Sequence, residues 1–117
     1  MMPARVLVVE DEALLAMALE QWLIDLGCEV VGPYYNLQDG LDHAVRQEID
    51  FALLDFDLGG GTNSIPIVER LTENGTPYVF VTGSPPEHIR RVLPAAKVIT
   101  KPVSARAIRE ALTAARS

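Results

Sequence analysis

Acidic, hydroxyl and basic side chains stand directly after the apolar runs of this sequence. Acidic residues follow the first and third runs, a threonine follows the fourth, and a lysine follows the last: Glu10, Asp11 and Glu12, then Asp55 and Asp57, then Thr82, then Lys101. Carboxylates that lie side by side without a counter-charge repel one another, so a hard divalent cation is their natural companion. Mg2+ bound by one or two carboxylates and a phosphate is a common arrangement. If the fold brings these residues together, they predict a metal site.

Five short apolar runs alternate with helix-like segments, and this rhythm predicts five consecutive βα units. The runs are residues 6–9, 30–31, 51–54, 78–81 and 98–99. Most of them are apolar on both faces, as expected of parallel strands that are covered by helices on each side. Right-handed crossovers put the C-terminal end of every such strand on the same edge of the sheet. The polar residues that follow the runs should therefore converge on that edge.

Helix signals fill the intervals between the apolar runs. Apolar residues at helical spacing precede Gly27, which is typical of a helix C-terminus, and Ser104 can cap the last helix. Ser84, followed by two prolines and Glu87, predicts a capping box at the start of the fourth helix. Pro94 ends that helix after roughly two turns. We therefore expect the fourth helix to be unusually short.

The size and composition of the chain fit one soluble domain. Of its 117 residues, 49% are hydrophobic and 22% are charged, which suffices for a packed core and is too apolar for a disordered chain. A net charge of -6 argues against direct nucleic-acid binding, which needs a basic footprint. The single cysteine, Cys28, fits a reducing, cytoplasmic setting, and we find no signal peptide or membrane span. Without a linker or repeat, residues 1–117 are expected to form one domain with no output domain.

Four motifs, taken in order, make the chain resemble a response-regulator receiver domain over essentially its whole length. They are Val8-Val9-Glu10-Asp11-Glu12, Leu53-Leu54-Asp55, Val81-Thr82-Gly83 and Thr100-Lys101-Pro102. Each motif is weak alone, and their order along the chain carries the inference. The resemblance implies an α/β fold of the flavodoxin-like, doubly wound type. Its five-stranded parallel sheet would have the strand order 2-1-3-4-5, with helices on both faces.

The resemblance also implies a role for each residue of the predicted site. The ligands of Mg2+ would be Glu10, Asp11, Asp55 and the backbone carbonyl of Asp57. Asp55 would attack a phosphoryl donor, Thr82 would hydrogen-bond to a phosphoryl oxygen, and Lys101 would neutralise charge on the transferred group. The implied function is that of a phospho-acceptor in two-component signalling. A sensor histidine kinase or a histidine phosphotransfer protein would supply the phosphoryl group.

Such a protein would be a signalling domain and not an enzyme that turns over a substrate. We expect it to act as a monomer or weak dimer that docks on a downstream protein, away from nucleic acid and membranes. The exposed side of the fourth and fifth helices, with Arg106 and Arg109, would form the regulated surface. The first helix, which starts beside the predicted site, would contact the kinase.

Three features depart from the commonest pattern of the family. Gly59 follows Leu58 where many receivers carry proline, Val98 stands where many carry an aromatic residue, and the fourth helix is short. A β-branched valine has few rotamers and cannot swing as an aromatic reporter does, so we expect residues 83–94 to move on phosphorylation. The run Tyr78-Val79-Phe80-Val81-Thr82-Gly83 is similar to a subgroup of stand-alone receivers with a Phe-Ala-Thr-Gly motif, which work with HWE-type kinases. Val81 replaces the alanine of that motif.

Two other functions fit part of the same pattern. A phosphohydrolase of the haloacid dehalogenase type also has an Asp-x-Asp motif like Asp55-Phe56-Asp57. Such enzymes place the nucleophile after the first strand and an acidic pair late, whereas Glu10 and Asp11 come first here. A protein-binding module that works without phosphate would keep the fold alone. The intact set of Asp11, Asp55, Thr82 and Lys101 argues against that module.

Overall fold

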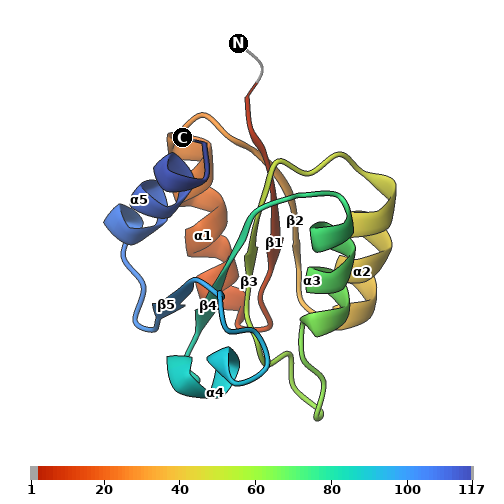
Figure 1. The fold of residues 1–117 in the computed structure, drawn as a ribbon. Coiled ribbons are helices and arrows are strands. Elements are labelled where there is room, and N and C mark those ends of the chain that lie inside the picture. Colours follow the sequence, from red (N-terminus) through yellow and green to blue (C-terminus); the bar gives the residue numbers. More distant parts are fainter. Residues whose placement is uncertain (1–2, 117) are drawn as a thin grey trace.

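Strands and helices alternate strictly along the chain in the computed structural model, which describes residues 3–116 (Figure 1). The strands are β1 (Arg5–Val9), β2 (Glu29–Tyr34), β3 (Phe51–Leu54), β4 (Tyr78–Thr82) and β5 (Val98–Thr100). The helices are α1 (Ala13–Asp25), α2 (Leu37–Arg46), α3 (Ile65–Glu73), α4 (Pro86–Arg90) and α5 (Ala105–Arg116). The predicted succession of five βα units is confirmed, with β2 longer than the apolar run 30–31 alone indicated.

All five strands lie in one parallel sheet with the order β2-β1-β3-β4-β5. Helices α1 and α5 cover one face of this sheet, and α2 and α3 cover the other (Figure 1). This is the flavodoxin-like, doubly wound arrangement that the sequence predicted. The chain reverses its winding direction after β2, so the crevice beyond the ends of β1 and β3 is the expected place for a ligand.

The core consists of two apolar clusters, one on each face of the sheet. Along β1, Leu7 and Val9 belong to the cluster under α2 and α3, whereas Val6 and Val8 belong to the cluster under α1 and α5. This division follows from the alternation of side chains along a strand. Because β1 is buried on both faces, the residues that directly follow it are held in fixed positions.

Helix α2 lies close to β1 because it carries glycine at the point of contact. A Cβ atom on Gly40 would lie 2.8 Å from Cγ2 of Val9 and 3.1 Å from Cδ1 of Ile67. A larger residue there would push the helix away from the end of β1. The glycine thus helps to fix the edge of the sheet where the polar residues gather.

The fourth helix is even shorter than predicted, and the capping-box prediction is wrong. Helix α4 has five residues, and Pro85 stands at its N-cap without a side-chain cap. The hydroxyl of Ser84 instead donates a hydrogen bond to Oδ2 of Asp57, a carboxylate in the loop after β3. Ser104 does cap α5, accepting a hydrogen bond of 3.1 Å from the Ala107 amide.

Among the helices of residues 3–116, none combines the length and apolar character needed to cross a membrane.

Candidate functional site

The C-terminal edge of the sheet brings together the polar residues that follow β1, β3, β4 and β5. An open pocket of about 530 Å³ lies there, and its lining includes Asp11, Asp55, Asp57, Thr82 and Lys101. These residues come from four separate segments of the chain, and the parallel sheet is the element that unites them. The pocket has room for a hydrated cation and a phosphoryl group together.

Three carboxylates form a compact acidic group at this edge. Glu10, Asp11 and Asp55 each offer one oxygen, and these oxygens all lie within 4.8 Å of one another. The backbone holds two of them in place, since the amide of Glu10 donates to Tyr34 O and that of Asp55 donates to Val9 O, both at 2.9 Å. Glu10 is 1% exposed and Asp55 5% exposed, whereas Asp11 faces solvent. The group therefore has a buried base and an open mouth.

Lys101 is the cation of the site. Its Nζ lies 3.0 Å from Oδ2 of Asp55 and 3.3 Å from Oε1 of Glu10. A third carboxylate, that of Glu12, lies 3.4 Å away. The backbone amide of Lys101 donates to Thr82 O at 2.9 Å, which fixes the start of the side chain at the end of β5. One ammonium thus faces three carboxylates, and negative charge is in excess.

Burial, together with this excess of negative charge, shifts the protonation of the carboxyl groups. Burial, aided by the nearby charge of Asp55, raises the pKa of Glu10 from 4.5 to about 8, although the Glu12 amide and Lys101 oppose the shift. Burial also raises the pKa of Asp55, against the hydrogen bonds from Glu10 and Lys101. Burial disfavours the charged form of Lys101, but Asp55, Glu10 and Glu12 outweigh it and raise the pKa of the ammonium. Without a further cation, the Glu10–Asp55 pair therefore retains a proton.

The residues present fit a divalent metal ion. Oε2 of Glu10 accepts a hydrogen bond of 3.1 Å from the Glu12 amide, whereas Oε1, also buried, accepts no hydrogen bond within residues 3–116 and lies 3.3 Å from Nζ of Lys101. A buried carboxylate oxygen without a donor is costly unless a cation is near. All-oxygen donor sets of this kind suit Mg2+.

Asp57 occupies a tight loop that leaves its carbonyl free. The loop is closed by hydrogen bonds from Leu58 N to Thr62 O at 3.0 Å and from Ser64 N to Phe56 O at 2.9 Å. Neither bond uses the Asp57 carbonyl, and no other donor in the described part of the chain reaches it. Gly59 lies in the left-handed region with φ 81°, and a Cβ atom there would be 3.7 Å from Oδ2 of Asp11. Glycine at this place keeps the loop close to the acidic group.

Thr82 and Ser84 complete the rim on the β4 side. Thr82 is buried at the end of β4, and its Oγ1 accepts a hydrogen bond of 3.2 Å from the Ser84 amide. The Ser84 hydroxyl is bound to the carboxylate of Asp57. Sequence reasoning missed this role of Ser84, because the two partners are 27 residues apart and only the fold brings them together. The one available signal was that Ser84 stands two residues after the end of β4.

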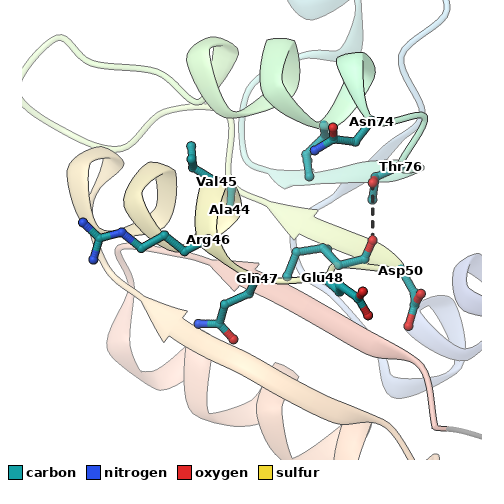
Figure 2. Close-up of a pocket in the computed structure, with 10 residues that line it drawn as sticks. Ala44, Val45, Arg46, Gln47, Glu48, Asp50, Asn74 and Thr76 are labelled. Atoms are coloured by element: carbon teal, nitrogen blue, oxygen red, sulfur yellow. Dashed lines mark hydrogen bonds between the residues drawn. The ribbon is translucent and has the colours of Figure 1, made fainter.

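A second open cavity, of about 450 Å³, lies at the opposite edge between the C-terminal ends of α2 and α3 (Figure 2). Figure 2 shows that Arg46 and Asp50 point in different directions, and that Thr76 donates a hydrogen bond to the carbonyl of Ile49. The charged groups do not converge there. Within residues 3–116, the acidic group at the other edge is the only set of three or more potential metal ligands.

Fold and site together define a receiver-type signalling domain: a doubly wound sheet with carboxylates after β1 and β3, threonine after β4 and lysine after β5. The model of the response regulator receiver domain family matches residues 6–113. The chain belongs to this family and is a phospho-acceptor of two-component signalling. Because the chain belongs to the receiver domain family, the alternative of a haloacid dehalogenase phosphohydrolase is excluded.

Solved structures and a curated relative agree with this assignment. SdrG from Sphingomonas melonis Fr1 is 33% identical, with a TM-score of 0.84 and coverage of 98% of both chains. The response regulator PhyR from Brucella abortus is 29% identical, with a TM-score of 0.84, and the match covers 97% of this chain and 48% of that one. A protein-glutamate methylesterase/protein-glutamine glutaminase from Archaeoglobus fulgidus is 31% identical over 105 residues. That match covers 84% of this chain but only 30% of the relative's length.

Proposed function

We propose that Asp55 is the residue that accepts the phosphoryl group, in a reaction that depends on Mg2+. The observation that carries this proposal is the environment of the Asp55 carboxylate. It lies 3.0 Å from the Lys101 ammonium, belongs to the acidic group with Glu10 and Asp11, and lines the open pocket. No other carboxylate in the described residues combines these three properties. A nucleophile, a cation and a metal site at one point are the parts that phosphoryl transfer requires.

The roles of the surrounding residues follow from their positions. An Asp55 oxygen forms the new bond to phosphorus, and the leaving group departs with the electron pair of the bond that breaks. Lys101 neutralises negative charge on the phosphoryl oxygens, and the Thr82 hydroxyl turns to donate its hydrogen to one of them. Mg2+, when bound, would neutralise the charge shared by the phosphoryl oxygens and the acidic group. Its ligands would be Glu10, Asp11, Asp55 and the carbonyl of Asp57.

Mapping the phosphorylated residue tests this proposal directly. Acetyl phosphate with Mg2+ should label the parent chain once, and reduction of the acyl phosphate with borohydride followed by mass mapping should place the label on Asp55. Asp55→Asn should remain unlabelled, while Asp42→Asn, a change on the outside of α2, should be labelled like the parent. A label on Asp57, His43 or His88 would refute the assignment. A chain that is folded but never labelled would favour the phosphate-independent binding module.

Helix α1 carries an unusually apolar outer face beside the site. Leu14 is 84% exposed, Met17 60% and Ile24 52%, so large side chains of this helix point to solvent as well as to the core. A helix that is apolar all round is normally buried on all sides. The face begins next to Glu12, at the mouth of the pocket. We assign it to the sensor histidine kinase or histidine phosphotransfer protein that brings the phosphoryl group to Asp55.

A charge placed on this face should separate the two routes to phosphorylation. Met17→Asp should lower labelling by a histidine kinase that phosphorylates the parent by at least about tenfold, because central apolar contacts dominate such interfaces. Labelling by acetyl phosphate should not change. Val45→Asp, at a similarly exposed valine on α2, is the matched control and should leave both rates as they are. Equal loss of both rates in Met17→Asp would assign the effect to the site and not to docking.

Phosphorylation of Asp55 must also change a surface that a downstream protein can recognise. Residues 83–94 contain the five-residue helix α4, and a helix this short has few internal hydrogen bonds to hold it. We propose that this segment moves when Asp55 is phosphorylated and that the movement changes the outer side of α4 and α5. The predicted contact residues Arg106 and Arg109 are exposed on α5, where they line a pocket shared with the end of α1. The site of action would be the cytoplasm.

A further inference from the structure

Ser84 is tied at two of its atoms to opposite sides of the site. Its amide donates to Oγ1 of Thr82 at 3.2 Å, and its hydroxyl donates to Oδ2 of Asp57. We propose that Ser84 is a positioning residue, whose two bonds hold the Thr82 hydroxyl and the segment after β4 in the unphosphorylated arrangement. The inference rests on the proposed roles of Asp55 and Thr82, and adds the restraint that phosphorylation must overcome.

The two hydrogen bonds of Ser84 form a tether between Thr82 and Asp57, and its Asp57 side is the fixed side. The loop of residues 56–64 is closed by two backbone hydrogen bonds, and the side chain of Asn63 accepts a further one of 3.0 Å from the Ile65 amide at the start of α3. Helix α3 is in turn anchored by Ile67 and Leu71 in the core. A carboxylate on such a loop is a stationary acceptor.

The Ser84 side is the movable side. Gly83 is exposed, and Pro85 and Pro86 have no amide hydrogen to donate, so Ser84 supplies the hydrogen bonds that hold this turn. Beyond it, α4 is anchored in the core by Ile89 alone among its five residues. When Thr82 turns its hydroxyl to a phosphoryl oxygen, the bond from the Ser84 amide lengthens or breaks, and the bond to Asp57 resists this change.

The bond to Asp57 is a hydrogen bond to a charged acceptor, which is stronger than one between neutral groups. Its loss should favour the displaced arrangement of the segment by about tenfold. Ser84→Ala removes the hydroxyl and keeps the amide. Ser84→Thr keeps both donors, so it should restore the behaviour of the parent. Asp57→Asn keeps an acceptor oxygen and removes its charge, so it should have a smaller effect.

Amide hydrogen exchange of residues 87–93, measured on the whole unphosphorylated chain, tests the inference. We expect exchange in Ser84→Ala to be about tenfold faster than in the parent, with recovery in Ser84→Thr. The double variant Ser84→Ala/Asp57→Asn should exchange no faster than Ser84→Ala, because Asp57→Asn only weakens a bond that Ser84→Ala has already removed. A fluoroberyllate complex of the parent should accelerate the same amides.

The outcomes distinguish this inference from the proposed function. If the amides of Ser84→Ala exchange at the rate of the parent while fluoroberyllate still accelerates exchange in residues 87–93, the tether is refuted. The proposal that residues 83–94 move on phosphorylation is then retained. Additive effects in the double variant would also refute the tether, since the two residues would then act separately. If fluoroberyllate leaves the amide exchange of residues 87–93 unchanged, the proposal that phosphorylation moves this segment is refuted. Absence of acetyl phosphate labelling at Asp55 would overturn the proposed function itself.

Discussion

Replacement of Lys101 by alanine should lower the rate at which acetyl phosphate labels Asp55 by about two orders of magnitude, the usual effect of removing one group that stabilises charge in a transition state. The Lys101 ammonium lies 3.0 Å from Asp55 and is the one cation in contact with the acidic group in the described structure. Without it, the incoming phosphoryl group meets the carboxylates with only the metal to offset their repulsion. Single-turnover labelling, followed by mass spectrometry, would measure the rate.

Two further variants make this result specific. Lys97→Ala removes an exposed lysine that directly precedes β5, at the opposite end of the strand from Lys101, and should label like the parent. Lys101→Arg keeps the charge but replaces a compact ammonium by a broad planar group, so it should recover only part of the rate. A loss of less than about threefold in Lys101→Ala would show that Lys101 serves packing and not transfer. Unfolding curves for each variant would separate a slow reaction from a loss of fold.

The free energy of unfolding of the metal-free protein should fall as the pH rises from about 5 to about 8. The folded state holds a proton on the Glu10–Asp55 pair, since burial raises the pKa of Glu10 from 4.5 to about 8, whereas the unfolded chain releases it near its ordinary value. The folded state therefore binds more protons in this range, and the slope of stability against pH is negative. Denaturant unfolding in EDTA at several pH values would measure the slope.

Magnesium should cancel this dependence. Ligation requires ionised carboxylates and displaces the retained proton, so Mg2+ affinity should rise by up to about tenfold per pH unit between pH 6 and 8. Glu10→Gln imitates the protonated form and should lose both the negative slope and most of the Mg2+ response. Glu29→Gln, at an exposed site near the start of β2, is the matched control. Mg2+ affinity that is independent of pH would show that the buried pair does not hold the ion, and unchanged affinity in Asp11→Ala would exclude Asp11.

Much of the fold was predictable because the sequence signals it locally. The apolar runs that became β1, β3 and β4 are buried on both faces, and this indicated a parallel sheet before its order was known. Once the sheet is parallel, the polar residues after its strands must meet at one edge, so Glu10, Asp55, Thr82 and Lys101 could be grouped from their positions alone. The strand order came from the resemblance of four motifs, not from periodicity.

Contacts between distant segments were decided only by the tertiary structure. The pattern around Ser84 is that of a capping box, yet Pro85 stands at the N-cap of α4, and the Ser84 hydroxyl donates to Asp57, a charged acceptor across the sheet edge. The raised pKa of Glu10 likewise depends on burial and on the nearness of Asp55. The sequence by itself determined which residues stand at the ends of the strands. Only the packed fold decided which of them touch, how deeply they are buried and where their protons reside, since these properties depend on distances between segments that are remote along the chain.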